Sequence, residues 1–175
     1  MADKTLKDLF VHTLKDLYFA EHAITKALPK MNKAAKSPEL KKAFQKHLKE
    51  TEGQIGRLEG TFKLLGMKPE GVPCEAIKGI IKEGEENIEE FSGTAALDAA
   101  LIATAQAVEH YEIARYGTLK CWAGELGLDK AASLIEETLE EEKATDAALT
   151  EIAESTVNIA AEGARQGTEK KRMTT

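Results

Sequence analysis

One stretch decides the fold: residues 66–94 read GMKPEGVPCEAIKGIIKEGEENIEEFSGT and separate two pairs of long helical segments. A structureless loop of this length is uncommon inside a compact domain. Isoleucines recur at roughly helical spacing between Glu75 and Glu90, so the pattern predicts a short helix within the connection. Such a connection can run the length of a bundle, and the two long segments that it joins are then parallel.

The four long segments are predicted at about residues 5–35, 38–65, 95–126 and 129–158. Residues that favour helix starts stand at three of them: Thr5 with Asp8, Ser37 before a proline, and Asp129 as an N-cap. Short links within each pair predict two antiparallel hairpins. Two hairpins joined by one long crossover have the connectivity of ferritin-like bundles.

We therefore predict an all-α fold, a ferritin-like four-helix bundle over residues 1–160 whose long crossover contains a short fifth helix. A flexible C-terminal tail is predicted over residues 161–175. The chain has 175 residues, of which 42% are hydrophobic and 31% charged, so it is long enough for one domain with a sizeable core.

Charge and hydropathy exclude several classes of function. The net charge of −6 gives no general attraction to nucleic acid or to anionic membranes. No apolar run approaches the roughly 20 residues that span a bilayer, and the start MADKTLKDLF lacks the apolar core of a secretory signal. Two cysteines are too few for a disulfide framework. We expect a soluble cytoplasmic protein without nucleic-acid or membrane partners.

Carboxylates interrupt the apolar stripes of three long segments. Glu21 lies on the stripe of the first segment, and Glu142 lies on that of the last. The stretch AVEHYEIARYG, residues 107–117, turns both Glu109 and Glu112 inward. Four glutamates are therefore predicted in the interior.

The second segment also turns polar halfway along, at His47, Thr51 and Gln54. The midpoints of the four segments fall near residues 20, 51, 110 and 143, each close to one of these polar positions. In a bundle of antiparallel hairpins the midpoints meet at one height. The polar positions of all four helices are therefore expected to form one layer.

Buried ionised carboxylates require protons, water or cations. Two divalent iron or manganese ions would satisfy four glutamates, and bundles that hold such ions use inward-facing Glu and His. Oxygen ligands favour these metals over tetrahedral zinc. We predict Glu21, Glu109, Glu112 and Glu142 as ligands, with Thr51 and Gln54 as weak ligands or supporting groups and Tyr116 as a hydrogen donor.

A hydrated carboxylate network is the alternative to the metal site, with hydrogen bonds from Gln54, His47, Thr51 and Tyr111 or Tyr116. The full di-metal motif, Glu-x-x-His on two helices, does not occur in this sequence. His12, His22 and His110 lie beside the apolar stripes, so we expect them at the surface.

Five blocks, in order along nearly the whole chain, carry a resemblance to a known family: LKDLYFAEHAITKALPKM (14–31), SPELKKAFQKHLKETEGQIGRLEGTFKLLG (37–66), CEAIKGIIKEGEE (74–86), AVEHYEIARYGTLKCWAGELG (107–127) and LIEETLEEEKATDAALTEIAES (134–155). The sequence resembles the bacterial YciE/YciF-type stress-response proteins, a ferritin-like family. The resemblance implies a homodimer of ferritin-like bundles with an extra helix and a metal site.

The resemblance also implies roles for individual residues. Ferritin-like relatives take ligands from the first, third and fourth helices, at positions that match Glu21, Glu109 or Glu112, and Glu142. Their second helix usually supplies Glu and His, where this sequence has Thr51 and Gln54, with Glu50 nearby.

Two functions are therefore expected. The first is a stress-related protein that binds one or two iron or manganese ions, with peroxide- or O₂-linked redox activity. The second is a non-catalytic helical dimer or scaffold that has lost the metal site. Iron storage in a cage is disfavoured, because nothing in the sequence indicates the interfaces of a large shell.

Overall fold

The computed structural model describes residues 3–163. Its elements are α1 (Leu6–Ala34), α2 (Pro38–Leu64), α3 (Glu75–Glu90), α4 (Leu97–Glu125), α5 (Asp129–Ile152) and a π-helical turn, η1 (Ala153–Val157). Helical backbone continues from this turn to residue 163, and the described residues contain no β-strand. The all-α class and the helix within the crossover are confirmed. The flexible tail was predicted over residues 161–175. Residues 161–163 are helical, and from residue 164 onward the tail lies outside the described residues and stays a prediction.

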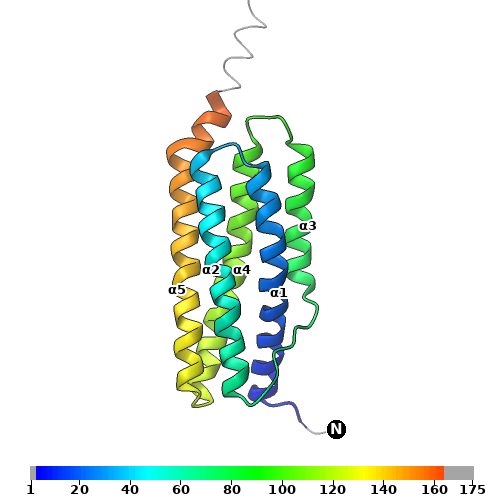
Figure 1. Ribbon diagram of the computed structural model, residues 1–175, viewed down its shortest axis with the longest axis vertical. Coiled ribbons are helices and arrows are strands. Elements are labelled where there is room, and N and C mark those ends of the chain that lie inside the picture. The colour runs from blue at the N-terminus through cyan, green and yellow to red at the C-terminus, as the bar shows by residue number, and fades with distance from the viewer. Residues whose placement is uncertain (1–2, 164–175) are drawn as a thin grey trace, which may run out of the picture.

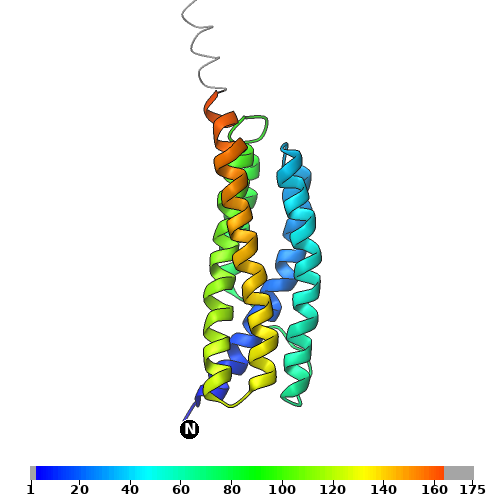
Figure 2. The same cartoon turned by 90° about the vertical axis from the view of Figure 1, so that its left-hand side faces the viewer.

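The four long helices form a ring in which α1 packs on α2, α2 on α5, α5 on α4, and α4 on α1. The helices α1 and α2 are antiparallel, as are α4 and α5, whereas α2 and α4 run in the same direction (Figure 1). This is the predicted connectivity. The fifth helix, α3, lies outside the ring and packs on α1 and α4. The perpendicular view shows the two hairpins side by side (Figure 2).

The helix ends follow local chemistry. Thr5 and Asp8 form a capping box, and Ser37 Oγ accepts a hydrogen bond from the Leu40 N–H, as predicted. The prediction of Asp129 as the N-cap of α5 is wrong, because this residue is already the first of the helix. A Schellman turn at Gly127, with φ of 66°, ends α4 so close to α5 that Leu128 occupies the N-cap position.

The α1–α2 turn is held by a buried carboxylate that sequence reasoning did not identify. Asp98, in the first turn of α4, accepts hydrogen bonds from the backbone N–H groups of Lys36 at 2.8 Å and Ser37 at 2.7 Å. These bonds join the two helical hairpins at one end of the bundle.

The apolar core is divided in two. The Phe10 core is built from Phe10, Leu14, Leu17, Leu58, Phe62, Tyr116, Leu119, Ile135 and Leu139. The Phe44 core is built mainly from Ile24, Leu28, Met31, Leu40, Phe44, Ile77, Leu101, Ile102, Val108 and Leu149. On every long helix, the residues between these two sets include buried polar side chains. The predicted polar layer therefore lies at mid-height, between two apolar cores.

Candidate metal centre

The polar layer is closed to solvent. The relative exposures of Glu21, Glu112 and Glu142 are 0%, and that of Glu109 is 1%. α1 supplies Glu21, α4 supplies Glu109 and Glu112, and α5 supplies Glu142. The structure thus brings all four predicted glutamates from three helices into the interior of the bundle.

A compact group within this layer includes a histidine. Nitrogen of His47 and one carboxylate oxygen each of Glu109, Glu112 and Glu142 all lie within 4.8 Å of one another. This spacing suits four groups that share one ion. The sequence predicted three of these residues as ligands, but it assigned His47 only to a hydrated network. His47 lies one helical turn before Thr51, on the same face of α2, so the register of the apolar stripe was the signal that could have identified it.

Glu21 lies beside this group of four and contacts Tyr116. The buried Tyr116 hydroxyl donates a hydrogen bond to Glu21 Oε1, as expected for a hydrogen donor. The other oxygen, Glu21 Oε2, is buried and has no hydrogen-bond partner within residues 3–163. Glu21 therefore retains one oxygen available to a cation.

The three predicted supporting residues of α2 differ in their contacts. The Thr51 hydroxyl donates to the backbone oxygen of His47 at 2.9 Å, which orients it toward its own helix. Gln54 Nε2 donates to Glu142 and, at 3.1 Å, to Glu141. Glu50 Oε1 lies 2.5 Å from Lys46 Nζ, while its Oε2 is buried. Only Gln54 bonds directly to a glutamate of the group.

Sequence reasoning also missed Arg57, which links α2 to α5. Its guanidinium donates to Thr138 Oγ1 at 2.8 Å, to Glu137 at 2.9 Å and to Glu141. Glu141 in turn accepts the hydrogen bond from Gln54. This network fixes the side chain of Gln54, which donates to Glu142, and places a positive charge at the edge of the polar layer.

Burial governs the charge of the group. Burial, followed by the charge of Glu142, raises the pKa of Glu21 to about 8. Burial and neighbouring carboxylates raise the pKa values of Glu109 and Glu112 well above their ordinary range, and burial also raises the pKa of Glu142. Burial lowers the pKa of His47 to about 4, so the imidazole is neutral near pH 7, which is the form that binds metal.

The unused hydrogen-bonding capacity of the layer fits a divalent cation. Within the described part of the chain, the buried atoms without a hydrogen-bond partner include both ring nitrogens of His47, both oxygens of Glu112, and one oxygen each of Glu21, Glu109 and Glu142. Each such atom costs about 1–3 kcal/mol if it stays unsatisfied. Coordination to a cation would satisfy several of these atoms together.

The other histidines lie away from this layer. His110 is exposed, and its Nε2 lies 3.3 Å from Asp146 Oδ2. His12 and His22 are also exposed. The predicted surface positions of these three residues are confirmed.

Known proteins resemble this chain in sequence and in structure over most of its length. A family model described as "Domain of unknown function (DUF892)" matches residues 5–162. Protein YciF of Escherichia coli (strain K12) is 49% identical over 160 residues, which cover 91% of this chain and 96% of that protein. The crystal structure of the E. coli stress protein YciF gives a TM-score of 0.85 at 48% identity and covers 89% of this chain and 99% of that chain. YcfI from Rhodopseudomonas palustris, whose description proposes a structural role, gives a TM-score of 0.82 at 52% identity, covering 84% of this chain and 94% of that chain.

Proposed function

Since this chain belongs to the DUF892 family, which its description leaves without a function, we propose that it binds divalent iron or manganese in the polar layer. The resemblance to YciF-type proteins seen in the sequence is confirmed by the identity of 49%. The proposal rests on one observation above all: one ligand atom each of His47, Glu109, Glu112 and Glu142 lies within 4.8 Å of the others in the buried interior of the bundle.

The donor set favours particular metals. Three carboxylates and one imidazole form an oxygen-rich site with a single nitrogen ligand, which suits iron or manganese better than zinc. Glu21 and Glu112 keep free oxygens that would serve a second ion, with Glu50 as a further neighbour. Four ionised glutamates carry the charge that two divalent cations neutralise. We therefore propose two ions per chain.

The surrounding residues define what the site would do. A bound iron or manganese ion would supply one-electron redox chemistry with O₂ or peroxide. Tyr116 donates a hydrogen bond to Glu21 and fixes that carboxylate, while Gln54 fixes Glu142. The Phe10 core and the Phe44 core exclude water from both sides of the layer. A role in stress response is proposed because the E. coli relative is described as a stress protein.

A second function is a non-catalytic helical scaffold, acting as a homodimer. The description of the R. palustris relative favours it, as does the absence of Glu-x-x-His from the sequence. In this alternative the buried glutamates stay protonated, and their removal does not reduce stability.

Replacement of Glu21 and Glu142 together by Gln separates the two functions. Thermal unfolding is measured with and without Mn²⁺, or Fe²⁺ under anaerobic conditions. A metal at about 100 times its dissociation constant stabilises the native protein by ~2.7 kcal/mol. We expect this stabilisation in the unmodified protein and its loss in the double variant.

The matched control replaces the exposed glutamates Glu52 and Glu140 by Gln and should keep the full metal response. Elemental analysis of the protein as isolated gives an independent count of bound ions. An unmodified protein that neither contains nor is stabilised by iron or manganese would contradict the metal site and favour the scaffold.

A further inference from the structure

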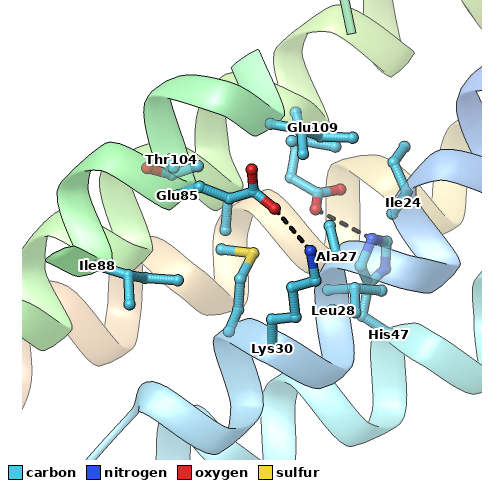
Figure 3. A pocket seen from close by; sticks show the side chains of 14 residues that line it. Ile24, Ala27, Leu28, Lys30, His47, Glu85, Ile88, Thr104 and Glu109 are labelled. Atoms are coloured by element: carbon cyan, nitrogen blue, oxygen red, sulfur yellow. Dashed lines mark hydrogen bonds and ion pairs between the residues drawn. The ribbon is translucent and has the colours of Figure 1, made fainter. Parts of the chain in front are cut away.

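A small cavity opens directly onto the candidate metal centre. It has a volume of about 30 Å³ and lies between α1, α3 and α4, with His47 of α2 at its boundary. His47 and Glu109 belong both to its lining and to the candidate centre. Figure 3 shows these two side chains facing each other at one side of the cavity, with Ile24, Ala27 and Leu28 of α1 nearby.

The fifth helix completes the cavity. α3 contributes Ile81, Gly84, Glu85 and Ile88 to its lining. Since α3 packs on both α1 and α4, it covers the groove that these two helices would leave open on a plain four-helix bundle. The crossover helix therefore turns a surface groove into an enclosed space beside the centre.

The chemistry of the wall restricts the occupant. Nearly all of the exposed lining is apolar. A cavity needs roughly 10–15 Å³ to admit one water, and a water there needs two to four polar partners. The observed volume thus admits a molecule of two or three heavy atoms, and the wall gives few hydrogen bonds. An ion or peroxide would lose its hydration without replacement, whereas an apolar diatomic molecule would lose little.

An open surface groove borders the cavity. A larger groove of about 320 Å³ runs between α1 and α3, and Ala27, Lys30, Ile81 and Glu85 line both spaces. Lys30 Nζ and Glu85 Oε1 lie 2.7 Å apart at this boundary, with side-chain exposures of 63% and 49%. An ion pair this exposed contributes little to stability, about 0–1 kcal/mol, so it can separate readily.

We propose that this cavity is the binding site and entry route of an apolar diatomic gas of the dioxygen class, which reaches the metal at the edge formed by His47 and Glu109. The inference rests on the proposed metal site. It narrows the oxidant from O₂ or peroxide to the dioxygen class, and it adds the direction of approach and a function for α3. The Lys30–Glu85 pair closes the outer end, and the apolar wall selects against charged oxidants.

Xenon gives a test that does not depend on a loaded metal. Crystals pressurised with xenon are expected to show one atom in the cavity, because dry apolar cavities bind xenon. Ala27→Leu, which fills the cavity from α1, should remove this peak. The matched control, Ala132→Leu, makes the same change at another half-buried alanine, on α5 against the Phe10 core, and should retain it. Ordered water in place of xenon would overturn the assignment to an apolar gas.

Kinetics then connect the cavity to the centre. Nitric oxide, an uncharged diatomic probe, is mixed anaerobically with the Fe²⁺-loaded protein, and its association is followed by absorbance. We expect Ala27→Leu to slow association about tenfold, which corresponds to ~1.4 kcal/mol in the barrier. Metal affinity, measured by calorimetry, should be unchanged in this variant, and Ala132→Leu should associate at the original rate.

The outcomes separate the two proposals. If the protein binds metal but Ala27→Leu binds nitric oxide at the original rate, the entry route is wrong and the metal site stands. If neither iron nor manganese binds, the proposed function fails, and the inference that depends on it fails with it. A fall in metal affinity in Ala27→Leu would also overturn the route, because the cavity would then belong to the metal site itself.

Discussion

His47 Nε2 lies 3.2 Å from Glu109 Oε1, and both side chains are almost completely buried. The contact is not an ordinary ion pair, because burial lowers the pKa of His47 to about 4 and raises that of Glu109. Neither ring nitrogen of His47 has a hydrogen-bond partner among residues 3–163. Without a metal, this imidazole is therefore a destabilising group in the interior.

Replacement of His47 by Leu should have opposite effects on stability and on metal binding. The metal-free variant should be as stable as the original or more stable, because a buried polar ring is replaced by an apolar side chain. Affinity for Fe²⁺ or Mn²⁺ should fall because the nitrogen ligand is lost. Urea unfolding in a chelator and calorimetry with Mn²⁺ measure the two effects. Unchanged affinity would remove His47 from the ligand set.

The metal-free protein should become less stable as the pH rises. The pKa of Glu21 is raised from 4.5 in the unfolded chain to about 8, so folding favours its protonated form. This contribution is complete below about pH 4.5 and is lost as the pH rises to about 8, at up to ~1.4 kcal/mol per pH unit for each such carboxyl. His47 acts oppositely, and its contribution is lost as the pH falls from 6.5 to about 4.

Several carboxyls contribute stability that is lost as the pH rises, whereas only one imidazole contributes stability that is lost as the pH falls. The decrease in stability toward alkaline pH should therefore dominate. Urea unfolding in a chelator at pH 5.5 and pH 8 tests this expectation. The control is the Glu21→Gln, Glu142→Gln double variant, whose stability should depend less on pH. Saturating Mn²⁺ should reverse the trend, since metal binding is favoured by deprotonated ligands. Metal-free protein that is more stable at pH 8 than at pH 5.5 would contradict the burial of these carboxyls.

Arg57→Lys should weaken metal binding without touching a ligand. A lysine carries its donors on one nitrogen and lacks the planar guanidinium fork that reaches Thr138, Glu137 and Glu141, so the position of Gln54 and, through it, of Glu142 is loosened. Changes in residues that orient ligands typically cost about 10–100-fold in metal affinity. Calorimetry with Mn²⁺ measures this loss. Arg115→Lys is the control, because its only ion pair within the described chain, with Asp16, is 3.9 Å long, and the Arg115 side chain is itself 42% exposed.

Gly84→Ala should push α3 away from α4. A Cβ at this position would lie 2.6 Å from Thr104 Cγ2, and the Thr104 side chain is held by a 3.2 Å hydrogen bond from Asn87. Overpacking of this kind costs ~1–3 kcal/mol, which exceeds the gain in helix propensity. On the same helix, Gly79→Ala meets no atom within 4 Å and should stabilise the protein by roughly 0.5–1 kcal/mol. Thermal unfolding of both variants gives the comparison, and equal shifts would refute the close contact.

The fold was largely predictable because its signals are local. Caps such as Thr5 and Ser37, the glycine at position 66 and the length of the crossover fix where helices begin and end. The inward glutamates were predictable as well, because each breaks an apolar stripe. Asp129 was misplaced by one residue because the tight turn after α4 depends on backbone hydrogen bonds that a sequence pattern does not specify.

The site was less predictable on α2. Thr51 and Gln54 occupy the expected stripe, yet a hydroxyl can bond to its own helix, as Thr51 does to the His47 carbonyl. Which of several polar residues on one face reaches the centre depends on the rotation and tilt of the helix, and both are set by packing against α1 and α5. Arg57 was missed for the same reason, since its partners lie 80 or more positions away along the chain.

The division of the core has a consequence for helix register. If α5 slid along its neighbours by one turn, about 5.4 Å, Glu142 would leave the polar layer and enter one of the two apolar cores without partners. A uniform Leu- and Ile-lined interior would tolerate such a slip much better. The mid-height glutamates therefore fix the register of the helices relative to one another, and they favour one arrangement of the bundle whether or not an ion is bound.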